Sequence, residues 1–276
     1  MAITVATDLS ARSDNAVGRA ALLADQLQTK AMALHAIDGN LPSAYRGHAK
    51  DWAAAHWPDM GSTMPLEVRE GVPADVIMTA ANADDCELLV YGVHGADDAD
   101  RNKARAFRWT TAGRSIAGTL TPTLLVTGDA KAPYRNVVVG IDFSVFSPLA
   151  IRQARRIAPA ATLHLVHAFH PPFTGLAGAD LAEDVAYQRQ LEIDAFIKAQ
   201  LADLKSTVGD EVNSHIVAGD PAAALRQVCQ QAQAELLVVS THGRSLFSRT
   251  IWGSVAEDIL NAPPCDVLVI KPIAAK

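Results

Sequence analysis

The chain has little of what marks nucleic-acid-binding, secreted or membrane-spanning proteins. Its 24 Lys and Arg residues are outnumbered by 30 Asp and Glu residues, so the net charge is −6 and no basic patch stands out. Proteins that bind nucleic acid concentrate positive charge, so this class is disfavoured. No apolar run approaches the roughly 20 residues of a membrane-spanning helix. Asp8 comes too early for a signal peptide.

Cysteine is also scarce, and its pattern excludes a disulfide framework. Cys86, Cys229 and Cys265 are odd in number and widely spaced. This usage suits a reducing compartment, so we expect a cytoplasmic protein. We expect the three thiols to behave as small buried apolar groups rather than as nucleophiles.

A metal site is not expected from the histidines of the second half. His164, His167 and His170 recur with a period of three, whereas one face of a strand repeats every two residues. His164 and His167 are therefore expected on opposite faces. No cysteine or carboxylate completes a recognisable ligand set beside them.

The sequence contains two copies of one pattern. Five short segments recur in the same order in the two halves: 5–10 with 139–144, 34–36 with 166–168, 71–74 with 219–222, 87–95 with 235–243, and 123–126 with 267–270. Collinear matches of this kind indicate two copies of one fold. The segment 127–134, which contains Gly128 and Pro133, is a short linker. We therefore expect an N-terminal domain over 1–128 and a C-terminal domain over 134–276.

Each copy alternates apolar strands with helices. In the second copy, the patterns predict strands at 136–141, 162–169, 211–217, 236–240 and 267–271, and helices at 148–158, 180–206, 222–233 and from Ser254 onward. The alternation predicts an α/β fold in which helices cover both faces of a parallel sheet. The apolar segments 123–126 and 267–270 would form exposed edges, so we expect them to pair with each other.

The segment after the fourth strand of the second copy has the composition of a phosphate site. Ser240-Thr241-His242-Gly243 follows the strand, and Gly253-Ser254 opens the next helix, with Ser254 expected as its cap. Glycine lets backbone N–H groups approach an anion, and the helix dipole favours negative charge. Ligands of such sheets bind beyond the carboxyl ends of the strands, where Asp142 also lies. The pattern indicates a nucleotide-type ligand. The alternatives are a tight turn with a helix cap, and a turn-forming aspartate.

These residues resemble the motif of the universal stress protein family, G-x2-G-x9-G-S/T, and the resemblance covers nearly all of the chain. The C-terminal copy differs at one position, where Ser240 replaces the first glycine. The chain is similar to tandem members, which implies two five-stranded parallel sheets of order 3-2-1-4-5, paired as an internal pseudo-dimer. It also implies that ATP, alone or with Mg²⁺, binds in the C-terminal domain. The binding residues so implied are Ile141, Asp142, Ala168, Ser240, Thr241, Gly243, Arg244, Gly253, Ser254 and Val255.

The N-terminal copy departs from this motif. It keeps Gly92 and Gly95, but the segment 96–108 is longer and acidic, and Trp109-Thr110 is expected to stand in place of Gly253-Ser254. A tryptophan where backbone must approach phosphate, and acids that repel an anion, predict no nucleotide in the N-terminal domain. Ser240 in the other copy is small, and it costs little where φ is negative.

The sequence therefore predicts a stress-response protein that binds ATP or a related adenine nucleotide in its C-terminal domain. Asp142 and the strand end at Ala168 would hold the nucleoside, and residues 240–254 the phosphates, while Arg244 either contacts phosphate or faces solvent. One alternative is a nucleotide-free interaction protein, in which Ser240 marks a lost site. The other is a weak ATPase, although no Walker lysine and no catalytic acid are evident. The sequence names no protein partner and leaves a further homodimer open.

Overall fold

The structure, a computed structural model, describes residues 2–11, 13–58, 63–92, 110–129, 132–169, 179–208, 212–241 and 253–271. The elements of the N-terminal repeat are β1 Ala2–Ala6, α1 Asp14–Gln26, β2 Lys30–Asp38, α2 Ser43–His56, β3 Leu66–Gly71, α3 Pro73–Ala81, β4 Cys86–Gly92, α4 Thr111–Gly118 and β5 Thr123–Val126. Those of the C-terminal repeat are β6 Asn136–Gly140, α5 Ser147–Ile157, β7 Thr162–Phe169, α6 Ala179–Val208, β8 Asn213–Ala218, α7 Pro221–Gln231, β9 Leu236–Ser240, α8 Ser254–Asn261 and β10 Asp266–Ile270.

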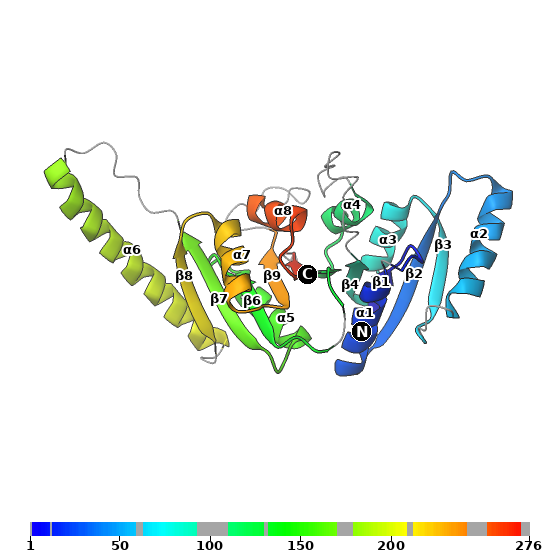
Figure 1. The fold of residues 1–276 in the computed structure, drawn as a ribbon, viewed down its shortest axis with the longest axis horizontal. Helices are drawn as coiled ribbons and strands as arrows, with labels where there is room; N and C mark the ends of the chain where they lie inside the picture. The colour runs from blue at the N-terminus through cyan, green and yellow to red at the C-terminus, as the bar shows by residue number, and fades with distance from the viewer. Residues whose placement is uncertain are drawn as a thin grey trace.

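The two repeats form one continuous sheet. Its strand order is β3-β2-β1-β4-β5-β10-β9-β6-β7-β8, so each repeat has the order 3-2-1-4-5 in its own strands. Neighbouring strands are parallel except at the centre, where β5 and β10 pair antiparallel with Leu268 opposite Leu124. Figure 1 shows the repeats side by side across this junction. The predicted fold class and the predicted pairing of the fifth strands are confirmed.

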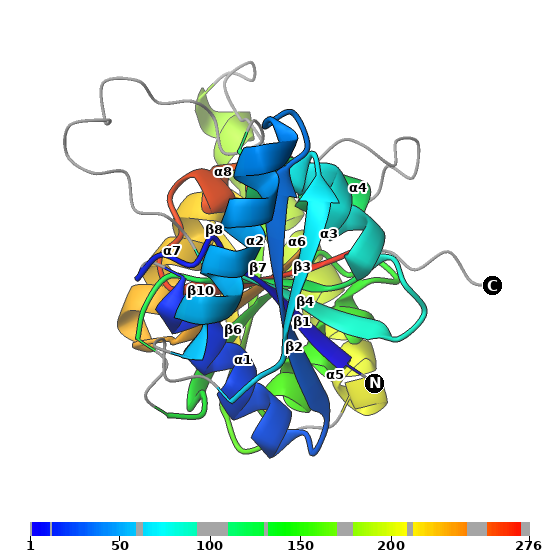
Figure 2. The same cartoon turned by 90° about the vertical axis from the view of Figure 1, so that its right-hand side faces the viewer.

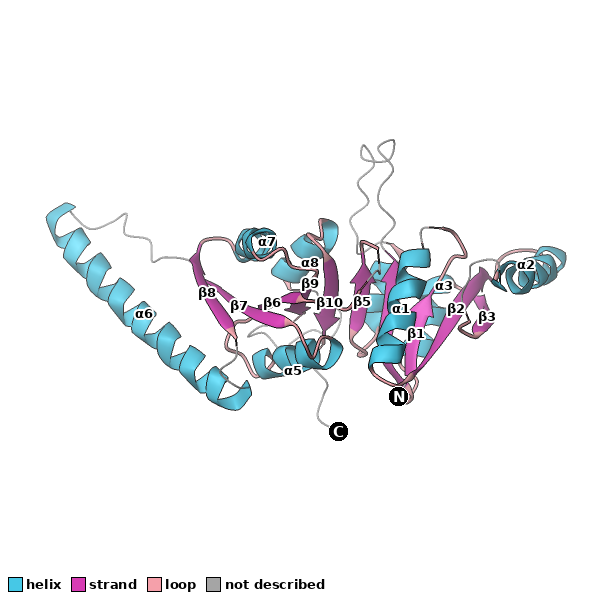
Figure 3. Ribbon diagram, turned by 60° about the horizontal axis from the view of Figure 1, so that its bottom comes forward, coloured by secondary structure: helices cyan, strands magenta, loops and turns pink. Residues whose placement is uncertain are grey.

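Helices cover both faces of the sheet, because the central strands are apolar on both sides. One buried cluster joins α1 and α5 to the sheet, with Leu23 and Ile151 fully buried. The other joins α3, α4, α7 and α8 to the opposite face, with Ile116 and Ile259 buried there. Figure 2 shows α1 and α3 on opposite sides of the strands of the N-terminal repeat, and Figure 3 shows α5 on one side of the strands of the C-terminal repeat with α7 and α8 on the other. We name the second of these faces the α7 face.

Helix α6 is much longer than its counterpart α2, with 30 residues against 14. Near its C-terminal end, Ile197 and Leu204 are buried. Its N-terminal end lies away from the sheet in Figure 1, and the side chain of Phe196 is 56% exposed. None of the described helices is both long and apolar enough to cross a lipid bilayer.

A buried polar cluster fastens the linker between the repeats. The carboxylate of Asp266, at the start of β10, accepts a hydrogen bond of 2.7 Å from the Tyr134 hydroxyl and one of 2.8 Å from the Thr127 N–H. It also forms an ion pair with the guanidinium of Arg19, with Nε 3.5 Å away. That guanidinium lies over the Tyr134 ring, 4.1 Å from its centroid, and donates to the Ala132 carbonyl. Helix α1, the linker and β10 are thereby held together.

Candidate ligand-binding site

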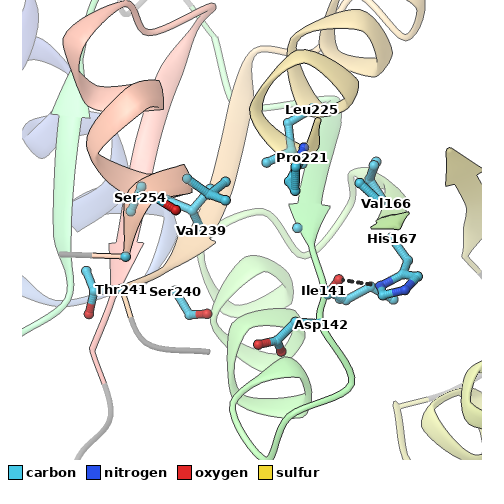
Figure 4. A pocket seen from close by; sticks show the side chains of 15 residues that line it. Ile141, Asp142, Val166, His167, Pro221, Leu225, Val239, Ser240, Thr241 and Ser254 are labelled. Carbon is cyan, nitrogen blue, oxygen red and sulfur yellow. Dashed lines mark hydrogen bonds between the residues drawn. The ribbon is translucent and has the colours of Figure 1, made fainter. Parts of the chain in front are cut away.

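A cavity of about 490 Å³ opens at the carboxyl ends of three strands of the C-terminal repeat. Strands β6, β7 and β9 end at its wall, and α7 and α8 begin there. In Figure 4, Asp142, Ser240 and Thr241 line the lower side, and Pro221, Leu225 and Val166 the upper side. This is the end of the sheet at which open α/β folds bind ligands.

Eight of the ten residues expected to bind ligand line this one cavity. They are Ile141, Asp142, Ala168, Ser240, Thr241, Gly253, Ser254 and Val255. The other two, Gly243 and Arg244, lie outside the described residues, as do His94, His242 and Trp109. Tertiary structure thus joins segments that are up to 114 residues apart in sequence, from Ile141 to Val255.

Asp142 lies in a strained turn that presents its carboxylate to the cavity. Its Oδ1 accepts hydrogen bonds from the Ser144 N–H at 2.9 Å and from the Ser147 hydroxyl at 3.1 Å. The next residue, Phe143, has φ of 57°, a left-handed conformation that is uncommon for an aromatic residue. The turn-forming role and the predicted ligand-binding role are compatible, because the turn uses only Oδ1. Among the described residues, no hydrogen bond reaches Oδ2.

His167 lines the cavity although the sequence did not assign it there. Its Nδ1 lies 3.0 Å from the Ile141 carbonyl oxygen, and its ring packs 4.5 Å from that of Phe143. A carbonyl oxygen accepts only, so Nδ1 carries the hydrogen. This bond fixes the turn of Asp142 to strand β7. The N-terminal repeat has the same bond between His35 and the Thr7 carbonyl, at 2.9 Å. The recurrence of the two histidines in the aligned copies was the sequence signal for this role.

One side of the cavity, which we call its floor, is apolar, and the sequence analysis did not predict the residues that form it. Val166, Pro221, Leu225 and Val239 contribute to it. Gly140 stands beside this surface, and a Cβ there would lie 3.3 Å from a Leu225 methyl group. An apolar wall with few polar groups suits the flat face of a purine base. The contributing residues lie on three elements distant in sequence, so no local motif marks them.

Among the residues that the structure describes, no side chain caps the N-terminus of α8. Gly253 is its N-cap residue, with φ of −62° and ψ of 143°, and its N–H donates to the Thr241 carbonyl at 2.8 Å. The expected capping by Ser254 is wrong, because Ser254 is already the first residue of the helix. A Cβ at Gly253 would lie 3.0 Å from the Thr241 oxygen, which is closer than such contacts normally come. The glycine permits this close approach of Gly253 to Thr241, and it brings no side chain to the first helical N–H groups.

The corresponding helix of the N-terminal repeat is capped. Helices α4 and α8 have eight residues each, and the N-cap of α4 is Thr110. Its hydroxyl accepts a hydrogen bond of 3.0 Å from the Gly113 N–H. Thr110, and not Trp109, therefore takes the place of Gly253, and the expected alignment was wrong by one residue. At α4, the Thr110 side chain therefore already occupies one helical N–H group, that of Gly113.

Tyr91 supplies a second difference between the repeats. It precedes the last residue of β4, as Val239 precedes the last residue of β9. Tyr91 is only 5% exposed, and burial raises the pKa of its hydroxyl. A buried phenol thus occupies the position at which a smaller valine lines the cavity of the C-terminal repeat.

Comparison with known proteins matches both repeats to one family. The sequence profile of the Universal stress protein family matches residues 1–107 and 133–271. The universal stress protein Rv1636 of Mycobacterium tuberculosis is 30% identical over 145 residues, covering 50% of this chain and 96% of that protein. A universal stress protein of Archaeoglobus fulgidus superposes with a TM-score of 0.68 at 20% identity, covering 98% of both chains. A functionally unknown protein of Pseudomonas aeruginosa gives a TM-score of 0.70 at 19% identity, covering 98% of this chain and 92% of that one.

Proposed function

Because the chain belongs to the universal stress protein family, we propose that its C-terminal repeat binds an adenine nucleotide, ATP, in the cavity at the ends of β6, β7 and β9. The observation that carries the proposal is the N-terminus of α8 on the wall of that cavity, where Gly253 lies against Thr241 and no side chain of the described residues caps the helix. A helix N-terminus beside a glycine attracts phosphate. The cavity beside it gives the rest of a nucleotide room.

The lining residues form three groups, which contact the phosphates, the ribose and the base of the proposed ligand. The first N–H groups of α8, with Ser240 and Ser254, receive the phosphates. The Asp142 carboxylate accepts hydrogen bonds from the ribose hydroxyls, because its Oδ1 is held by the turn and its Oδ2 is left for the ligand. The base lies against Val166, Pro221 and Leu225, beside the backbone of Ala168. Nucleotide binding would change the partners or conformation of the protein; no residue is assigned to hydrolysis.

The proposal extends to the organisation and setting of the chain. We divide it into repeats over 1–128 and 134–276, since β5 ends at Val126 and β6 begins at Asn136. We assign no nucleotide to the N-terminal repeat, and the assignment is supported by the Thr110 cap on α4 and by the buried Tyr91 side chain. All three cysteines are free thiols, which suits a cytoplasmic protein.

The proposal is tested by measuring nucleotide binding in a variant in which the N-terminus of α8 receives an N-cap side chain. Gly253→Thr copies the residue of the N-terminal repeat, so its hydroxyl would bond a helical N–H and its Cβ would press on the Thr241 carbonyl. We expect affinity for MgATP to fall by at least about tenfold, or roughly 1.4 kcal/mol. The matched control is Gly47→Thr on exposed α2, where a Cβ meets nothing within 4 Å.

Native mass spectrometry with MgATP, followed by calorimetry, measures this effect. One nucleotide per chain, lost in Gly253→Thr and retained in Gly47→Thr, is the expected result. Two nucleotides per chain would contradict the assignment of the N-terminal repeat as empty. No binding at millimolar MgATP would reject the proposal and favour a nucleotide-free interaction protein.

A further inference from the structure

Two histidines from different strands meet on the α7 face, at the outer edge of the sheet. Nδ1 of His164, on β7, lies 3.1 Å from Nε2 of His215, on β8. The rings are nearly parallel, with an interplanar angle of 27° and centroids 5.3 Å apart. Val166 is the register partner of His215, so the two histidines are diagonal neighbours. Both side chains are partly exposed, so the pair is open to solutes.

The strand pleat keeps both imidazoles on one side of the sheet. Leu163 and Leu165 belong to the core cluster under α5, while Val166 belongs to the cluster under α7. Side chains alternate along a strand, so His164 shares the α7 face with Val166. His215 shares it with Val217, which packs against the same cluster. The pair lies toward the N-terminal ends of its strands, away from the nucleotide cavity at their carboxyl ends.

We infer that His164 and His215 form a surface site for a divalent first-row transition-metal ion, with the two imidazole nitrogens as its protein ligands and water as the rest. Imidazole is a preferred ligand of Cu²⁺, Ni²⁺ and Zn²⁺. With metal–nitrogen bonds of about 2.0–2.1 Å, nitrogens 3.1 Å apart would subtend an angle of about 98° at the ion. That angle fits neighbouring positions of a square-planar or octahedral ion and lies near the tetrahedral value.

Burial and the neighbouring His215 both lower the pKa of His164. In a neutral imidazole, one ring nitrogen has a lone pair and the other carries a hydrogen. Without metal, one ring donates an N–H to the other across the 3.1 Å contact. With metal, that hydrogen moves to the other nitrogen of its own ring, so both facing nitrogens become ligands and no net proton is lost.

The number of ligands sets the expected strength of the site. Among the described residues, no group of three or more His, Cys, Asp or Glu side chains could hold a metal ion. Two imidazoles and water make an exchangeable site rather than a closed structural one. Affinity should follow the order Cu²⁺ > Ni²⁺ for these nitrogen ligands. A bound ion would link the edge strand β8 to β7 and raise the thermal stability of the metal-bound chain.

The experiment titrates the untagged full-length chain with CuCl₂ or NiCl₂ in a buffer that does not bind metal. We expect one ion per chain, with an affinity in the micromolar range, and at least a tenfold loss in His164→Gln and in His215→Gln. His48→Gln removes a histidine from exposed α2 and is the matched control, with unchanged affinity expected. Circular dichroism of each variant verifies that the fold is retained.

A spectroscopic measurement on the wild-type chain does not depend on any variant. In ¹⁵N spectra of the histidines, Ni²⁺ should first perturb Nδ1 of His164 and Nε2 of His215. The inference is overturned if these nitrogens do not respond at 1:1 metal, or if both Gln variants bind as tightly as the wild type. In that event, the contact between His164 and His215 is an N–H···N hydrogen bond that joins β7 to the edge strand β8. The result is independent of nucleotide binding, because the metal is added alone.

Discussion

Replacing Asp266 by alanine should weaken the junction between the two repeats strongly. Asp266 is 4% exposed, and its carboxylate accepts hydrogen bonds from the Tyr134 hydroxyl, from both the N–H and the hydroxyl of Thr127 and, at 3.4 Å, from the Gly128 N–H. Removing it leaves the buried Arg19 guanidinium without its carboxylate partner. Breaking a buried ion pair by deleting one member costs about 3–5 kcal/mol. The four hydrogen bonds are part of that figure and are not added to it, because they belong to the same network.

Urea unfolding of the full-length chain, followed by circular dichroism, measures this loss. We expect the free energy of unfolding to fall by about 3–5 kcal/mol and the melting temperature by roughly 10 °C. Asp258→Ala is the matched control. Asp258 pairs with Arg226 at 3.3 Å on the surface, and its side chain is 57% exposed. A surface pair of this kind contributes about 0–1 kcal/mol.

A double-mutant cycle with Arg19→Met separates the ion pair from general damage to the linker. If Asp266 acts mainly by neutralising Arg19, the double variant should lose less free energy of unfolding than the two single variants lose together. We expect the difference to be at least about 1 kcal/mol. The reasoning is refuted if Asp266→Ala costs no more than Asp258→Ala. It is equally refuted if the losses from Arg19 and Asp266 simply add.

Two further predictions concern the ends of helix α4. Burial lowers the pKa of Lys271 to about 8, and its ammonium donates to the Ala117 carbonyl. Between pH 8 and 10.5, the unfolded chain therefore binds more protons at this lysine than the folded chain does. The free energy of unfolding should rise with pH across this range, by about 3 kcal/mol at most from this group. Lys271→Met should flatten that rise in denaturation curves across the range; an unchanged slope would contradict the assignment. Thr110→Ala should cost about 1 kcal/mol by removing the cap on Gly113. Thr111→Ala, at the first helical position, is its control in thermal melts, and equal losses in both would refute the capping role.

The sequence by itself determined the fold and half of the site, because those signals are local. Apolar strands alternate with helical patterns, and a repeated order of short segments fixes the copy number without any knowledge of distant contacts. The motif around Ser240 and Gly253 is likewise contiguous or nearly so. This motif predicted a ligand-binding site at the carboxyl ends of the strands, and the cavity lies there.

Tertiary structure decided what depends on contacts between remote segments. The apolar floor with Pro221 and Leu225 comes from α7, which no spacing rule connects to Asp142. The equivalence of Thr110 with Gly253 required the helix starts to be seen, since an insertion hides it in the sequence.

The histidine pair shows the same limit most directly. His164 lacked a partner among its sequence neighbours, and His215 is 51 residues further on. Strand pairing and pleat bring their nitrogens together, because a parallel sheet sets neighbours by register and face rather than by distance along the chain.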